Sequence, residues 1–219
     1  MSGYFNIAGF YNDFSDIQLF GGLVSKNTNI VAGGAAIINA GKARIQGIEV
    51  DSSVSPVEGL RFDLGYTFLD TRLKALVPPV LPPDSPYSTV NPTAAVGKPL
   101  SLSPKHRVSL SANYTLPLDE SVGRISLGVN YVHTSRQILN ASSPIQTRNQ
   151  PATDLVNLNA GWDGIFGSPI DIGMFVTNLT NETYILSTSA GFASNGYETS
   201  IIAPPRMWGF RLRYNFSVD

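Results

Sequence analysis

The residues best placed for covalent chemistry are His133 and Ser135, two positions apart in Tyr131-Val-His-Thr-Ser-Arg136. Residues two apart on a β-strand share a face, so the imidazole could activate the hydroxyl as a nucleophile. Such a pair also needs a third group that orients the histidine. Asn130, three positions before His133, faces the other side of a regular strand. We therefore predict no catalytic residue and interpret the segment as an ordinary strand end.

Metal and cofactor chemistry find equally little support. The chain has no Cys, which excludes thiolate metal sites, disulfides and a Cys nucleophile. Its two His lie far apart in the sequence, and no metal ligand set or phosphate-binding loop is indicated. Lys and Arg number 15 against 16 Asp and Glu, and this balance does not provide the basic face that nucleic-acid binding requires. We predict no metal, no cofactor, no nucleic-acid partner and no enzyme activity.

Long polar segments offer the better candidates for binding a small molecule. Two Arg lie near the ends of one such segment, and a guanidinium fork suits a carboxylate or phosphate group on a ligand. Polar residues also occur at loop tips simply because water surrounds them. The candidate ligand-binding residues are Arg136, Gln137, Arg148, Asn149 and Tyr197.

The elements that would position these residues show a period of two. Near the C-terminus, five apolar residues alternate with Gly, Arg and Asn: Trp208, Phe210, Leu212, Tyr214 and Phe216. The same alternation occurs in 60–68, 108–116, 125–131, 156–162 and 170–176. Neighbouring side chains on a strand point to opposite faces, so each segment is predicted to be a strand with one apolar and one polar face.

About eight strands are predicted, at 3–19, 43–55, 59–72, 104–116, 123–136, 153–163, 169–178 and 206–216. Short links alternate with long ones at roughly 20–42, 73–103, 137–152 and 179–205, which places the long links at one end of the sheet. That layout is typical of an outer-membrane β-barrel with short periplasmic turns and long extracellular loops. We predict an all-β fold of antiparallel transmembrane strands in an up-and-down meander.

A soluble β-sandwich also has alternating strands, but its exposed face should carry more Lys and Glu than these strands do. Charged residues make up 14% of the chain, against about 25% in soluble globular proteins. No stretch reaches the roughly 18 apolar residues of a transmembrane helix. The composition therefore favours membrane strands and a location in the bacterial outer membrane.

Five motifs occur in an order that resembles the TonB-dependent outer-membrane receptors. The resemblance covers essentially the whole chain. The motifs are Asn6-Ile-Ala-Gly-Phe-Tyr-Asn-Asp-Phe-Ser-Asp-Ile-Gln18, Gly41-Lys-Ala-Arg-Ile-Gln-Gly-Ile-Glu49, Leu102-Ser-Pro-Lys-His106, Val176-Thr-Asn-Leu-Thr-Asn-Glu-Thr-Tyr184 and Pro205-Arg-Met-Trp-Gly-Phe-Arg-Leu-Arg-Tyr-Asn-Phe216.

The resemblance implies a barrel of 22 strands, plugged by an N-terminal domain that TonB contacts. The eight predicted strands match the last eight, so residues 1–219 are expected to be the C-terminal part of the barrel domain, without a plug domain or a signal peptide. Its closing strand would contain Trp208, Phe210, Leu212, Tyr214 and Phe216. The chain ends three residues beyond Phe216, whereas the terminal aromatic is commonly the last residue of such barrels.

The implied function is energised uptake of a scarce nutrient, most commonly a ferric siderophore or a similar iron complex. The implied partners are a small-molecule ligand, outer-membrane lipid and the barrel-assembly machinery, with the plug and TonB only in a full-length receptor. The alternative is a stand-alone eight-stranded barrel with a structural or adhesive surface role. That barrel would have to pair strand 3–19 with strand 206–216, because unpaired edges attract other chains.

Overall fold

The computed structural model describes all residues except 28–30, 93, 142–148, 190–195 and 217–219. Eight long strands form one antiparallel sheet, in which each pairs with the next long strand in the chain. This arrangement confirms the predicted meander. The strands are β1 (Ser2–Ser25), β2 (Val31–Val57), β3 (Leu60–Leu76), β5 (His106–Thr115), β6 (Arg124–Thr134), β9 (Thr153–Asp163), β10 (Ile170–Thr177) and β13 (Met207–Tyr214).

The register places the apolar positions of all these strands on one face of the sheet. Phe210 lies opposite Met174, Met174 opposite Ala160, and Ala160 opposite Leu127. None of the described residues forms a layer over this face, and Leu212 is 74% exposed and Phe210 69% exposed. A continuous apolar surface of this size marks an interaction with a partner or a membrane. No helix in the described part of the chain is long and apolar enough to cross a membrane.

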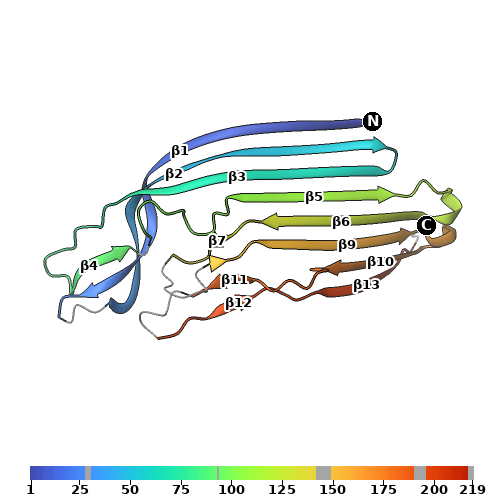
Figure 1. The fold of residues 1–219 in the computed structure, drawn as a ribbon. Helices are drawn as coiled ribbons and strands as arrows, with labels where there is room; N and C mark the ends of the chain where they lie inside the picture. The colour runs from blue at the N-terminus through green and yellow to red at the C-terminus, as the bar shows by residue number, and fades with distance from the viewer. Residues whose placement is uncertain (28–30, 93, 142–148, 190–195, 217–219) are drawn as a thin grey trace.

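The two ends of the sheet differ, as Figure 1 shows. At one end β1 begins and β13 ends, and this end carries three short turns: Glu58–Gly59 and the turns that hold the 3₁₀ segments η1 (Glu120–Val122) and η3 (Ile165–Gly167). In one of these turns, the hydroxyl and the amide of Ser121 donate to the carboxylate of Asp119, and these bonds lower the pKa of Asp119. The opposite end, which we call the long-loop end, carries the extended connections.

Those connections contain strands that the sequence analysis assigned to loops. The β6–β9 connection forms a small hairpin of β7 (Gln137–Ile138) and β8 (Asn149–Gln150), and the β10–β13 connection forms one of β11 (Ile185–Thr188) and β12 (Ser200–Ile202). In the β3–β5 connection, β4 (Tyr87–Pro92) pairs with residues 21–25 of β1 and becomes a ninth strand of the main sheet.

The predicted loop at 20–42 is wrong over most of its length. β1 and β2 continue beyond the alternating region, with Leu19 opposite Ile38 and Gly22 opposite Ala35. Ile38 packs with Val90 of β4 in a small hydrophobic cluster outside the main apolar face. The segment has no period of two because its strands no longer separate an apolar environment from a polar one, so the alternation that identified the other strands is absent here.

The motif 176–184 has a structural role at the end of β10. Asn178 is buried, and its side chain donates to the carbonyl oxygens of Glu182 (2.9 Å) and Pro204 (3.3 Å) and accepts from the Glu182 amide (2.8 Å). Asn178 has a φ of +51°, a conformation that Asn adopts more readily than most residues. The motif therefore fixes the path by which the chain leaves β10.

Gly59 in the β2–β3 turn allows a test of the sheet geometry. Its φ is +76°, and a Cβ there would lie 2.1 Å from the Thr115 carbonyl oxygen, whereas a Cβ on Gly97 (φ +83°) would meet nothing within 4 Å. Both Ala variants lose about 1–2 kcal/mol through the left-handed backbone. We expect Gly59→Ala to lose a further 1–3 kcal/mol or so, because the two strands must shift.

The measurement is urea unfolding of the protein extracted from outer membranes into detergent, with Gly97→Ala as the matched control. Equal unfolding midpoints for the two variants would contradict the close approach of the turn to Thr115.

Candidate functional site

A pocket of about 280 Å³ lies at the long-loop end of the sheet. It brings together Arg136, Gln137 and Asn149, three of the five candidate ligand-binding residues. The remaining lining comes from the end of β3 and from the β3–β5 connection. These residues are Leu69, Asp70, Thr71, Pro99, Ser103 and Lys105, with Ile138 from β7.

Backbone pairing holds the walls of the pocket in place. Gln137 pairs with Gln150 and Ile138 with Asn149, so the two ends of the β6–β9 connection meet. The Leu102 amide donates to the Ile138 carbonyl oxygen (2.8 Å), which ties the β3–β5 connection to that hairpin. The Leu100 amide donates to Oγ1 of Thr71 (3.0 Å) and fixes the same connection against β3.

The pocket has an excess of positive charge. Lys105 and Arg136 are exposed, and in the described part of the chain neither forms an ion pair. Nζ of Lys105 lies 5.7 Å from the centroid of the Phe68 ring. The carboxylate of Asp70 is already bound by Arg44 and Gln46. Two unpaired cations beside amide groups suit an anionic ligand with several oxygen atoms.

The other two candidates are not brought into this pocket by the described residues. Tyr197 lies in the β11–β12 connection and is 61% exposed. Arg148 lies outside the described residues. The structure therefore places Tyr197 on a different hairpin from Arg136, Gln137 and Asn149.

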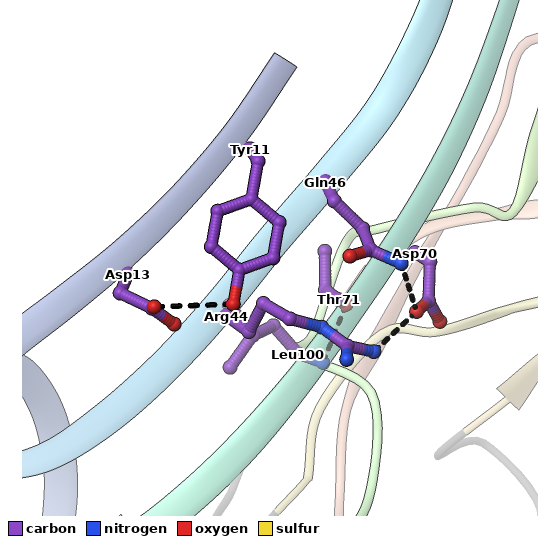
Figure 2. Close-up of polar contacts among 7 residues, drawn as sticks. All are labelled: Tyr11, Asp13, Arg44, Gln46, Asp70, Thr71 and Leu100. Carbon is purple, nitrogen blue, oxygen red and sulfur yellow. Dashed lines mark hydrogen bonds and ion pairs between the residues drawn. The ribbon is translucent and has the colours of Figure 1, made fainter. Parts of the chain in front are cut away.

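A polar cluster that the sequence analysis missed lies across β1, β2 and β3 (Figure 2). Nη2 of Arg44 contacts Oδ2 of Asp70 at 2.6 Å, Nε2 of Gln46 donates to the same oxygen at 3.3 Å, and the Tyr11 hydroxyl donates to Asp13 at 3.1 Å. The sequence contains a sign of this cluster. Arg44 and Gln46 follow the same period of two as Ile48 and Val50, but they are polar where those two residues are apolar.

His133 and Ser135 each have a different partner. Nδ1 of His133 lies 2.8 Å from Oδ1 of Asp154 on β9, and the Tyr131 hydroxyl donates to the same oxygen at 2.6 Å. Oγ of Ser135 accepts from the His106 amide at 2.9 Å. No hydrogen bond joins His133 to Ser135 within the residues that the structure describes. The site thus holds an oriented imidazole without a hydroxyl bonded to it.

The comparisons with known proteins decide the family. Residues 2–179 match the family model described as TonB dependent receptor-like, beta-barrel. The chain belongs to this family. TonB-dependent receptors are outer-membrane β-barrels of Gram-negative bacteria, and proteins of the family bind small ligands. Among curated protein sequences, no relative of the chain was found.

Solved structures of TonB-dependent receptors share the fold. The ferric yersiniabactin uptake receptor FyuA from Yersinia pestis is 16% identical, with a TM-score of 0.71, over 98% of this chain and 28% of that one. BauA, the ferric preacinetobactin receptor from Acinetobacter baumannii, is 20% identical, with a TM-score of 0.63, over 98% and 27%. The copper transporter OprC is 14% identical, with a TM-score of 0.63, over 98% and 29%. The chain thus spans less than a third of the length of these proteins.

Membership of the TonB-dependent receptor family orients the sheet in the membrane. The apolar face is the lipid-facing surface, the polar face lines the barrel interior, and the short turns are periplasmic. The pocket that contains Arg136 therefore lies at the extracellular end. The polar cluster of Figure 2 continues the lipid-facing side beyond the last apolar pair, Ile48 and Phe68.

Two valines on β6 test the assignment of the faces. Val129 lies opposite Ala112 and Leu158 on the lipid-facing side, whereas Val132 lies opposite Ser109 and Leu155 on the interior side. We expect Val129→Arg to destabilise the protein by about 2–4 kcal/mol, because it places a charge near the bilayer midplane. Val132→Arg should have little effect.

Both variants are compared by the amount of folded protein recovered from outer membranes and by the urea concentration at the midpoint of unfolding. Equal losses for the two variants would show that the faces have been assigned wrongly.

Proposed function

We propose that this chain forms part of the barrel wall and the ligand-binding loops of a receptor that takes up a scarce nutrient. The proposed ligand is an anionic iron complex of the ferric siderophore class. The observation that carries the proposal is the extracellular pocket in which Lys105 and Arg136 lie beside Gln137 and Asn149, with no carboxylate partner among the described residues. Such a pocket offers several donors to the oxygen atoms of a metal chelate.

The charge of the pocket supports an anionic ligand more directly than the fold does. FyuA and BauA are receptors for ferric complexes, but OprC, which has the same fold, is a copper transporter. The fold is thus compatible with more than one metal. Among the described lining residues, Asp70 alone is acidic, and its carboxylate is bound by Arg44 rather than by Lys105 or Arg136.

In the proposed receptor, this chain supplies the last eight of 22 strands, and TonB drives uptake through a plug that fills the barrel. The polar face carries ion pairs suited to a wet lumen, with Arg61 2.8 Å from Asp63 and Arg124 2.8 Å from Asp163. The barrel-assembly machinery would recognise the closing strand, whose aromatic side chains Trp208, Phe210 and Tyr214 lie on the lipid-facing side.

Arg136→Gln tests the proposed ligand site. In the complete receptor we expect it to weaken binding of the recognised ferric siderophore at least about tenfold, because a charge-assisted hydrogen bond contributes roughly 1.5–3 kcal/mol. Lys105→Gln should act in the same direction. The measurement is fluorescence quenching with a panel of ferric hydroxamates, catecholates and carboxylates.

The matched control is Lys26→Gln, which removes a cation from the β1–β2 end, where Nζ of Lys26 binds the Pro83 carbonyl oxygen instead. If Arg136→Gln and Lys26→Gln bind every ferric complex of the panel with equal affinity, the pocket is rejected as the ligand site.

The alternative of a stand-alone eight-stranded barrel requires β1 to pair with β13. In the described residues, β1 pairs with β2 and β4, and β13 pairs with β10. The sheet is an open wall rather than a closed cylinder (Figure 1). Two open edges favour a part of a larger barrel over a small surface protein with a structural or adhesive role.

The 219-residue chain refolded alone in detergent separates the two functions. We expect an aggregated product whose gel mobility does not change on heating, because two strand edges are unpaired. A known eight-stranded outer-membrane barrel, refolded in parallel, is the control. A compact, heat-modifiable monomer in the micelle would instead support the stand-alone barrel.

A further inference from the structure

Four cations lie on β2 and β3 just beyond the extracellular end of the apolar belt. We call Lys42, Arg44, Arg72 and Lys74 the outer basic patch. Gln46 and Asp70 form the first pair beyond Ile48 and Phe68, and Arg44 and Arg72 lie opposite each other in the same alternation. Lys42 shares the face of Arg44, and Lys74 is the exposed residue at the register shift that follows. The patch therefore continues the lipid-facing side.

The depth of the patch matches the headgroups of the outer leaflet. Arg72 lies four residues beyond Phe68, which is about 13 Å along the strand. Tyr66 and Tyr131 on the lipid-facing side, and Trp208 at the extracellular end of β13, lie where the aromatic girdle of a barrel meets the interface. The outer basic patch begins immediately above that girdle.

The interior side of the same segment is covered by the chain itself. Ala43 and Leu73 are each 1% exposed. The β3–β5 connection covers them: the Leu73 amide donates to the Lys98 carbonyl oxygen (3.0 Å), and the Gly97 amide donates to the Leu73 carbonyl oxygen (2.8 Å). Only the outer side of this segment is available to another molecule.

The charges on that outer side are not balanced within the described part of the chain. Asp70 binds Arg44, and Asp13 accepts from Tyr11, whereas Lys42, Arg72 and Lys74 have no ion pair or side-chain hydrogen bond there. Nε of Arg44 is buried, and no described residue forms a hydrogen bond with it. Like charges directly opposite each other on paired strands are destabilising. Asp70 offsets the charge of Arg44, whereas Arg72, directly opposite Arg44, has no bound anion among the described residues.

We propose that the outer basic patch binds the phosphate groups of an anionic lipid in the outer leaflet. Guanidinium groups bind phosphate in a bidentate manner, and basic clusters at the membrane surface bind lipid headgroups. The patch faces the lipid rather than the lumen, lies at headgroup depth and is next to the apolar belt that would contact the acyl chains. These three features select a membrane lipid over a soluble phosphate compound.

The test uses the receptor extracted from outer membranes in mild detergent. The variant Lys42→Gln/Arg72→Gln/Lys74→Gln removes three charges from the outer basic patch. The matched control, Arg61→Gln/Arg211→Gln/Arg213→Gln, removes three charges from the interior face. Phosphate assay and native mass spectrometry measure the lipid that co-purifies with each protein. We expect the patch variant to carry at least about tenfold less bound phosphorylated lipid than the unmodified receptor, and the control to carry an unchanged amount.

A second measurement identifies the phosphate source. Delipidated receptor is mixed with vesicles that contain a bis-phosphorylated lipid, with the same vesicles after phosphatase treatment, or with inorganic phosphate. Binding only to the phosphorylated vesicles, with charge-conserving Arg72→Lys still active, supports the proposal. Equal lipid loss in the patch and control variants, unchanged binding after phosphatase treatment, or full competition by millimolar inorganic phosphate would each overturn it.

Discussion

The structure depends on the requirement that backbone groups inside a membrane be paired within the protein, since lipid offers them no hydrogen bonds. The eight-strand sheet satisfies this requirement internally, where every long strand lies beside its neighbour in the chain. Among the described residues, two strand edges stay unpaired: the edge of β1 away from β2 along its membrane-spanning part, and the edge of β13 away from β10. Strands beyond those described here would complete both edges, which agrees with the chain spanning 28% of the length of FyuA. An open edge in lipid is therefore the physical reason to interpret this sheet as one wall of a larger barrel.

The same sheet sorts its side chains by depth as well as by face. Along the lipid-facing side of β3, apolar residues from Leu60 to Phe68 give way to Asp70 and Arg72. On β6 and β9 the change occurs at His133 and Asp154, which bond to each other. The alternation of faces continues past this level, but the chemistry of the outward positions changes from apolar to charged. One register thus produces the apolar belt, the polar cluster of Figure 2 and the outer basic patch.

This dependence on depth also explains what could be predicted from the sequence. Alternation identified the membrane strands because each separates lipid from a wet interior. It did not identify the extension of β1 and β2, β4 or the loop hairpins, where both sides have similar surroundings. Arg136, Gln137 and Asn149 were predicted together because they lie near the two ends of one connection. Lys105 comes from another connection, so its place beside Arg136 in the pocket could not be predicted from local spacing. The contact between Asp154 and His133 depends on the β6–β9 register, so it could not be predicted from local spacing either.

Residues 69–73 of β3 link the two surfaces for which ligand binding is proposed. Thr71 faces the interior side and accepts from the Leu100 amide, which holds the connection that carries Ser103 and Lys105. Asp70, its neighbour, has its carboxylate on the lipid-facing side, bound to Arg44. Because successive residues of a strand point to opposite faces, this short segment supports the wall of the pocket and also sets the charge of the outer patch. Because the Asp70 carboxylate is bound to Arg44 on the lipid-facing side, it offsets one of the four cations of the outer basic patch and leaves the charges of Lys42, Arg72 and Lys74.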